Sequence, residues 1–93
     1  MNEILTTLNG KKGIIMGIAN ERSIAWGIAS FLNKQGAKLA FSYPNESIKK
    51  RVEPLAQQCN SDMVFECDVS SDKSIENFFK NISNKWNELD FLV

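Results

Sequence analysis

The sequence predicts an α/β fold, the first half of a doubly wound parallel sheet in the order β-α-β-α-β-α-β. Two observations lead to this prediction. Short, continuously apolar segments of strand length alternate with longer segments whose apolar residues recur at helical spacing. Strands separated by helices of this length connect by right-handed crossovers, and the resulting parallel sheet is covered by helices on both faces.

Four segments have the length and flanks of buried strands, because they are continuously hydrophobic where a half-exposed strand would alternate. They span residues 13–16, 38–43, 63–67 and 90–93. A parallel sheet normally continues from such a fourth strand into another helix. We therefore expect residues 1–93 to be the N-terminal part of a single larger domain.

Three helical patterns lie between the predicted strands. The first places on one face Ile24, Ile28, Phe31 and Leu32, and it ends at Gly36, a residue suited to a left-handed C-terminal cap. The second has the stripe Ile48, Val52, Leu55, Ala56 and Cys59, with Asn45 as N-cap. The third aligns Ile75, Phe78, Phe79, Ile82 and Trp86, and it is entered through Ser71 or Asp72. Because Pro54 lacks a backbone donor, we expect a kink or a break near Val52, but not the loss of the second helix.

Composition excludes several classes of protein. Lys plus Arg number 11 and Asp plus Glu number 11, so no basic surface for nucleic acid is expected. No segment approaches the roughly 20 apolar residues of a membrane span, and residues 1–10 lack the features of a signal peptide. With 43% hydrophobic and 24% charged residues, the chain is expected to be a globular protein of the cytoplasm.

The two cysteines do not indicate a metal site. Cys59 and Cys67 form no CxxC pair, and the chain contains no histidine, so zinc binding is not expected. We predict that both cysteines are reduced thiols in the core.

The turn after the first strand, with the sequence GIANERSIAWG, is a candidate phosphate site. In a doubly wound sheet of the Rossmann type, ligands bind beyond the carboxyl ends of the strands, and free amides at a helix N-terminus attract anions. Gly17 has no Cβ to block a pyrophosphate. Ser23 fits as the N-cap, and its hydroxyl could serve either the helix amides or a phosphate oxygen. Because the turn lacks GxGxxG, the residues alone leave open both a nucleotide-binding loop and an ordinary strand-to-helix turn.

The loops after the second and third strands would meet the adenosine of a bound dinucleotide. After the second strand, an Asp or Glu normally binds the ribose 2′-hydroxyl, and an Arg accepts a 2′-phosphate. Pro44 stands at this position, and the absence of Lys or Arg before Lys49 favours NAD over NADP. After the third strand, Asp68 could accept the adenine amino group and Val69 could pack on the ring, although Asp68 equally fits a turn or cap carboxylate.

The segment GIANERSIA, residues 17–25, matches the G-x5-S-x-A pattern of divergent short-chain dehydrogenase/reductases. Among them, the chain resembles the bacterial NADH-dependent enoyl-[acyl-carrier-protein] reductases. The blocks GAKLAFSYPNES, KRVEPLA, CDVSSDKSIENFF and KWNELDFLV resemble successive blocks of that family in order and spacing. The resemblance extends from about residue 8 to residue 93.

The resemblance implies a set of cofactor-binding residues for NADH. Gly17, Ser23 and Ile24 would hold its pyrophosphate end, Ala19 would line the loop, and Asp68 and Val69 would hold the adenine. The family usually has Gln where this chain has Pro44, so a side-chain contact to the adenosine ribose is lost here. No metal site is implied.

The resemblance also implies an activity. The family reduces a trans-2-enoyl thioester on acyl-carrier protein in type II fatty-acid synthesis, as a cytoplasmic homotetramer. Its catalytic Tyr and Lys lie beyond the end of this sequence, so we expect residues 1–93 to supply the cofactor-binding half of an NAD(P)-binding Rossmann domain, with no catalytic residue and no activity alone.

Two alternatives remain open at this point. One is another short-chain reductase of the same shape, acting on a ketone or sugar; a downstream Tyr-x3-Lys in place of Tyr-x6-Lys would indicate it. The other is a non-catalytic nucleotide-binding α/β module. A receiver-type domain would need clustered acidic residues at the end of the first strand, and Met16 and Gly17 stand there instead.

Overall fold

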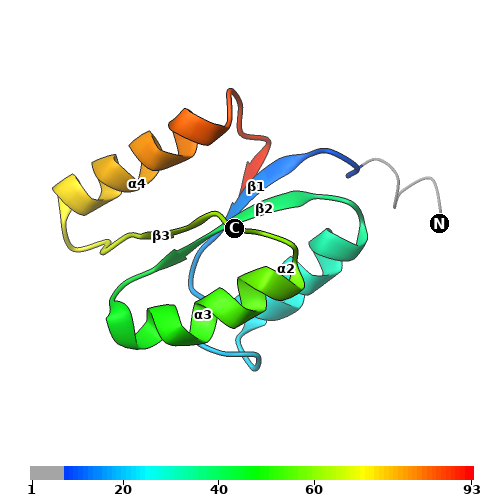
Figure 1. Cartoon of the computed structure of the whole chain (residues 1–93), viewed down its shortest axis with the longest axis horizontal. Coiled ribbons are helices and arrows are strands. Elements are labelled where there is room, and N and C mark those ends of the chain that lie inside the picture. Colours follow the sequence, from blue (N-terminus) through cyan, green and yellow to red (C-terminus); the bar gives the residue numbers. More distant parts are fainter. Residues whose placement is uncertain (1–7) are drawn as a thin grey trace.

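The computed structural model describes residues 8–93, which form a four-stranded parallel sheet with helices on both faces (Figure 1). The elements in chain order are β1 (Lys12–Ile15), α2 (Ile24–Lys34), β2 (Lys38–Tyr43), α3 (Glu46–Gln58), β3 (Val64–Glu66), α4 (Asp72–Lys85) and β4 (Phe91–Leu92). The strand order is β3-β2-β1-β4. The predicted fold class and element order are confirmed. The bounds of β2 are as predicted, β1 lies one residue earlier, and β3 and β4 are shorter than predicted.

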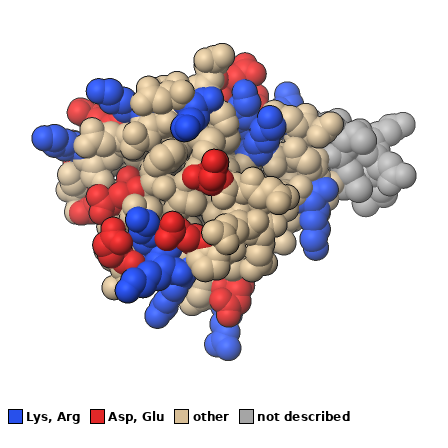
Figure 2. Space-filling view, in the orientation of Figure 1, with Lys and Arg blue, Asp and Glu red and all other residues tan. Residues whose placement is uncertain are grey.

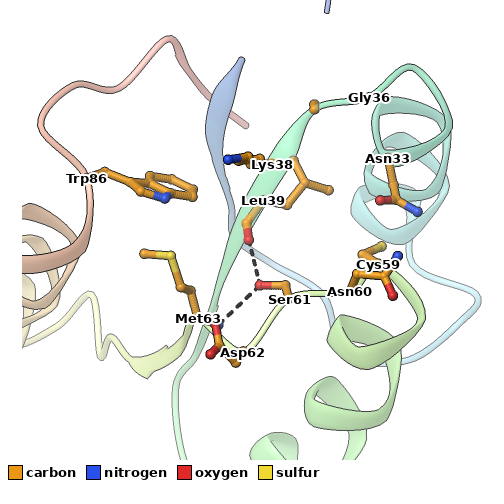
Figure 3. Close-up of a pocket in the computed structure, with 11 residues that line it drawn as sticks. Asn33, Gly36, Lys38, Leu39, Cys59, Asn60, Ser61, Asp62, Met63 and Trp86 are labelled. Atoms are coloured by element: carbon orange, nitrogen blue, oxygen red, sulfur yellow. Dashed lines mark hydrogen bonds between the residues drawn. The ribbon is translucent and has the colours of Figure 1, made fainter. Parts of the chain in front are cut away.

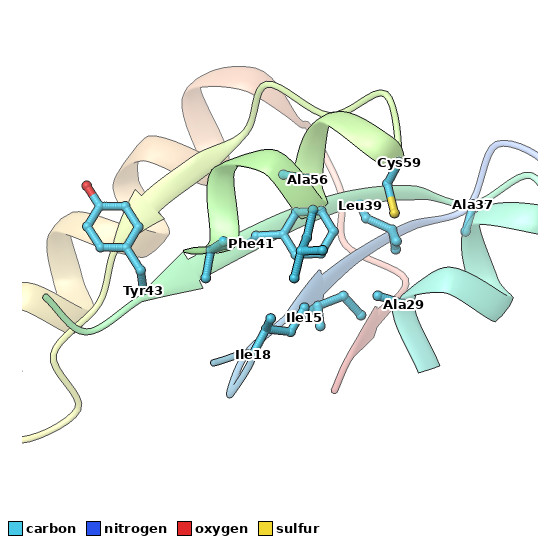
Figure 4. Packing of buried hydrophobic residues seen from close by; sticks show 11 residues of the cluster. Ile15, Ile18, Ala29, Ala37, Leu39, Phe41, Tyr43, Ala56 and Cys59 are labelled. Atoms are coloured by element: carbon cyan, nitrogen blue, oxygen red, sulfur yellow. The ribbon is translucent and has the colours of Figure 1, made fainter. Parts of the chain in front are cut away.

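Two hydrophobic clusters, one on each face of the sheet, explain why the strand segments are continuously apolar. Helices α2 and α3 cover one face and α4 covers the other (Figure 1). Neighbouring residues of β1 point to opposite faces, so Ile15 joins Phe41 in the cluster under α2 and α3, while Ile14 joins Phe78 in the cluster under α4. Figure 4 shows the larger cluster, in which Phe41 is fully buried. A strand that is covered on both faces is therefore apolar at nearly every position, and Ser42 of β2 is the exception among the buried strand residues described.

Helix α2 faces the sheet differently from the prediction. Ile24, Ile28 and Phe31 are 84%, 38% and 57% exposed, so most of the predicted apolar stripe is not in the core. Of the predicted stripe, Leu32 packs against the larger cluster, as expected. Ala25 and Ala29 pack there in place of the other three, because their small side chains allow the helix axis to approach the strands. Helix α2 is apolar on nearly all sides, so the spacing of its apolar residues did not identify the buried face. We call Ile24, Ile28 and Phe31 the outer face of α2.

Both helices on this side of the sheet end in the same backbone motif. Gly36 has φ +91°, its N–H donates to the Asn33 carbonyl at 3.0 Å, and the next N–H donates to the Leu32 carbonyl at 3.1 Å. These are the two hydrogen bonds of a Schellman motif, which confirms the predicted left-handed cap. Asn60 ends α3 in the same way with φ 55°, and its N–H donates to the Gln57 carbonyl at 3.0 Å.

The starts of α3 and α4 have the predicted side-chain caps. The Asn45 side chain accepts a hydrogen bond from the Ile48 N–H at 3.1 Å. For α4, Ser71 and not Asp72 is the cap. Helix α3 runs from Glu46 to Gln58, so the expected break near Val52 is wrong, whereas the helix itself is retained as predicted. Exposed Pro54 leaves a single helix bond unmade while the apolar side of α3 stays packed.

Both cysteines are buried free thiols, as predicted. Burial raises the pKa of each thiol, and the neighbouring Asp68 carboxylate raises that of Cys67 further.

Residues 8–93 contain no cluster of His, Cys, Asp or Glu able to hold a metal ion, and none of their helices is long and apolar enough to cross a membrane. Acidic and basic side chains are interspersed over the face in Figure 2. The signal-peptide prediction concerns residues 1–10, of which 1–7 lie outside the described residues.

Replacing Gly36 tests the end of α2. The substitution Gly36→Ala is expected to lower the free energy of unfolding by about 1–2 kcal/mol, because a Cβ there would lie 3.0 Å from the Asn9 Cα at a positive φ. Urea denaturation of the full-length protein that carries this sequence measures the change. Asn60→Gly, at the equivalent position of α3, is the matched control and should leave stability unchanged or raise it. Equal stability of Gly36→Ala and the unmodified protein would contradict the left-handed Schellman motif assigned to Gly36.

Candidate functional site

Three loops meet at one edge of the sheet, because the carboxyl ends of parallel strands lie on the same side. They are residues 16–23 after β1, 44–45 after β2 and 67–71 after β3. Strand β2 lies between β1 and β3, with Phe41 paired to both Ile15 and Val64. This edge therefore contains every predicted cofactor-binding residue of the chain.

Gly17 opens the loop after β1 and leaves space for a ligand. Its φ is +83°, a conformation that favours glycine, and a Cβ placed on it would meet no atom within 4 Å. The next side chain, Ile18, is 2% exposed and packs in the larger cluster, so it anchors the loop to the core. The loop backbone is thus fixed on one side and open on the other.

Ser23 organises this loop. Its Oγ accepts hydrogen bonds from the backbone N–H of Ala19 at 2.9 Å and of Asn20 at 3.2 Å, and its own N–H donates to the Asn20 carbonyl at 3.1 Å. Ser23 occupies the N-cap position of α2, as predicted, but its hydroxyl makes no bond to the helix amides. A hydroxyl accepts two hydrogen bonds and donates one. With both lone pairs used by the loop, the hydroxyl proton is left to donate to a ligand.

The first amides of α2 are also available to a ligand. The N–H groups of Trp26 and Gly27 both donate to the Ser23 carbonyl, at 3.1 Å and 3.2 Å. The N–H groups of Ile24 and Ala25 have no acceptor within residues 8–93. Unpaired amides at a helix N-terminus, together with the helix dipole, attract an anion.

The loop after β3 presents a carboxylate in a fixed orientation. Asp68 Oδ1 accepts hydrogen bonds from the Ser70 hydroxyl at 2.6 Å and the Ser70 N–H at 3.0 Å. The Asp68 N–H donates to the Ser74 Oγ at 2.8 Å. The hydrogen bonds from Ser70 lower the pKa of Asp68, so the side chain is an anionic acceptor at neutral pH. Val69 is 72% exposed beside it, as an apolar surface without a partner in the described chain.

The structure adds three residues that the sequence had not indicated. Asn20 shapes the first loop, since its side-chain oxygen also accepts from the Arg22 N–H at 2.7 Å. Ser70 and Ser74 hold Asp68 in place. The sequence could not single out these residues, because Asn and Asp-x-Ser sequences form local hydrogen bonds of this kind in many turns.

A cavity of about 400 Å³ lies at the opposite, amino edge of the sheet and takes no part in this site. Figure 3 shows it between Trp86 on one side and Gly36 and Asn60 on the other. On its floor, the Ser61 Oγ donates to the Leu39 carbonyl at 2.6 Å and accepts from the Met63 N–H at 3.1 Å. These bonds satisfy the hydroxyl and connect the end of α3 to β2.

Comparisons with known proteins agree with this geometry. Residues 17–93 match the family model described as Enoyl-(Acyl carrier protein) reductase. The chain is 51% identical over 86 residues to enoyl-[acyl-carrier-protein] reductase [NADH] 2 of Rhizobium meliloti, covering 92% of this chain and 32% of that protein. It is 46% identical over 86 residues to the corresponding NADH reductase of Aquifex aeolicus, with 92% and 32% covered.

Solved structures show the same similarity. FabI from Candidatus Liberibacter asiaticus superimposes with a TM-score of 0.90 at 50% identity, covering 91% of this chain and 33% of that chain. The enoyl-(acyl-carrier-protein) reductase from Anaplasma phagocytophilum, solved in complex with NAD, gives a TM-score of 0.87 at 46% identity, with 91% and 32% covered. This chain therefore spans about a third of the length of these relatives.

The orientation of Asp68 can be tested through its pKa. Ser70→Ala removes the hydroxyl donor, so the pKa of Asp68 is expected to rise toward its ordinary value, and the carboxylate should protonate at a higher pH than in the unmodified protein. NMR titration of the Asp68 side-chain carboxyl carbon measures this. Ser83→Ala, which removes a hydroxyl bonded within α4, serves as the control and should have no effect. An unchanged Asp68 titration in Ser70→Ala would contradict the assigned hydrogen bonds.

Proposed function

This chain belongs to the enoyl-(acyl carrier protein) reductase family, and from that premise we propose that residues 1–93 are the cofactor-binding part of an NADH-dependent enoyl-[acyl-carrier-protein] reductase. The full-length protein would reduce a trans-2-enoyl group carried on acyl-carrier protein in fatty-acid biosynthesis. The names of the Rhizobium and Aquifex relatives support the cofactor and the substrate. The cofactor-binding role is carried by one observation, the hydrogen bonding of Ser23.

The Ser23 loop has the donors that a pyrophosphate requires. The Ser23 hydroxyl proton and the amides of Ile24 and Ala25 are free to donate, while the Ser23 oxygen is already satisfied by the loop. Gly17 leaves the approach open because no Cβ fills it. We therefore assign to Gly17, Ser23 and Ile24 the binding of the pyrophosphate, with Ala19 lining the loop.

Asp68 and Val69 would bind the adenine. A carboxylate held by two bonds from Ser70 keeps acceptor capacity for the adenine amino group, and the exposed Val69 side chain offers an apolar contact to the ring face. Once bound, NADH supplies a hydride. The residues of this chain bind and orient the dinucleotide at the carboxyl edge of the sheet.

The catalytic side chains would come from sequence beyond residue 93. The single tyrosine, Tyr43, is 8% exposed and its side chain belongs to the larger core cluster, so we assign it no catalytic role. The outer face of α2 and the edge strand β4, which pairs only with β1 in the described sheet, support a single NAD(P)-binding Rossmann domain that continues past this sequence. A homotetramer in the cytoplasm is part of the same proposal, and it rests on the family resemblance.

A charge placed at Gly17 tests the pyrophosphate site. Gly17→Asp in the full-length protein is expected to raise the Kd for NADH at least about tenfold, because a carboxylate would repel the phosphates. Titration of NADH fluorescence measures it. Gly10→Asp is a matched control, since Gly10 also has a positive φ, 79° against 83° at Gly17, and an equally open Cβ position, but at the amino end of β1. Equal affinities of the two variants would exclude the loop as the phosphate site.

The absence of catalytic residues gives a second test. A purified polypeptide of residues 1–93 is expected to show no oxidation of NADH with a crotonyl thioester above background, since the Tyr and Lys that would stabilise the developing charge are expected beyond residue 93. The full-length protein, assayed by absorbance at the same concentration, is the positive control. Measurable turnover by the 93-residue polypeptide would overturn this part of the proposal.

A further inference from the structure

Asn9 and Gly10 form a tight turn before β1. The Lys11 N–H donates to the Leu8 carbonyl at 3.0 Å. Gly10, the third residue of the turn, has φ +79°, whereas the φ of Asn9 is not positive. This is the pattern of a type II turn, whose third position favours glycine. Asn9 and Gly10 are both exposed, and a Cβ at Gly10 would meet no atom within 4 Å. The Asn9 side chain is therefore accessible to water, and the residue after it has no side chain.

An asparagine that precedes glycine can react with its own backbone. The nitrogen of the next residue attacks the Asn Cγ, a C–N bond forms, and the side-chain nitrogen leaves as ammonia, which gives a succinimide ring. Water then opens the ring at either carbonyl, and the product is Asp or isoaspartate. Glycine makes ring closure easiest because no Cβ hinders the attack. Asn9 is the only asparagine of the sequence that is followed by glycine.

The end of α2 holds the attacking nitrogen. The Gly10 N–H donates to the Gly36 carbonyl at 3.1 Å, and a Cβ on Gly36 would lie 2.8 Å from the Asn9 Oδ1. The nitrogen attacks only after it loses its hydrogen, so a hydrogen bond that keeps this hydrogen in place slows the reaction. Ring closure therefore requires the turn to separate from Gly36, which is a local opening of the fold.

We propose that Asn9 is a site of spontaneous deamidation, and that the contact of its turn with Gly36 sets the rate. The reaction consumes only water and releases ammonia, and it does not depend on the proposed function. An isoaspartate at residue 9 places an additional carbon in the backbone of the turn, so the hydrogen bond from Gly10 to Gly36 is lost. The modified turn lies at the amino end of β1, at the edge opposite the candidate cofactor site.

The test measures the chemical state of Asn9 in the full-length protein during incubation in mildly alkaline buffer. Peptide mapping by mass spectrometry gives the fractions of Asn, Asp and isoaspartate at each asparagine, in native buffer and in concentrated urea. In urea, Asn9 should convert faster than every other asparagine, including Asn60, because Asn60 is followed by Ser61, whose Cβ hinders the attack. In native buffer, Asn9 should convert to both Asp and isoaspartate, at least about tenfold more slowly than in urea.

Two variants separate the contact with Gly36 from the reactivity of the local sequence. In Gly36→Ala the new Cβ displaces Asn9, so Asn9 should convert about tenfold faster in native buffer and at an unchanged rate in urea. Gly10→Ala should slow the conversion in urea, since a Cβ then hinders the attack. No conversion of Asn9 in the native unmodified protein, or slower conversion than at Asn60 in urea, would overturn the site. Equal rates in native buffer and in urea, or equal native rates in Gly36→Ala and the unmodified protein, would overturn the role of Gly36.

Discussion

The parallel pairing of β1 with β2, and of β2 with β3, is the constraint on which the candidate site depends. Residues far apart in the sequence, such as Ser23 and Asp68, come to the same edge only because these strands point in one direction. The pairing requires helices on both faces, and these helices provide the two hydrophobic clusters that bury the strands. The architecture that stabilises the fold therefore also brings the residues of the candidate site to one edge.

At that edge, the polar groups of the two loops form hydrogen bonds with one another, and a few donors and acceptors stay free. Ser23 accepts from two loop amides and keeps its proton, and Asp68 accepts from Ser70 and keeps its second oxygen. These internal hydrogen bonds fix the orientation of both side chains in the absence of a ligand. One loop leaves donors and the other leaves an acceptor, as a pyrophosphate and an adenine amino group respectively require.

The two faces of α2 differ in what covers them. The inner face, with Ala25, Ala29 and Leu32, packs on the sheet. The outer face exposes Ile24 and Phe31. The chain spans about a third of the length of its relatives.

The sequence by itself determined the order of the elements, the bounds of β2 and the left-handed end of α2 at Gly36. Each depends on a local pattern: a continuous apolar run, or a glycine where the backbone needs a positive φ. It also identified the loops of Ser23 and Asp68 as the candidate site, through a motif whose family places them there. Only the tertiary structure decided which face of α2 is buried and what the Ser23 hydroxyl binds. The first depends on packing against neighbouring elements, and the second on which donors compete for the Ser23 Oγ. The spacing of residues in the sequence encodes neither.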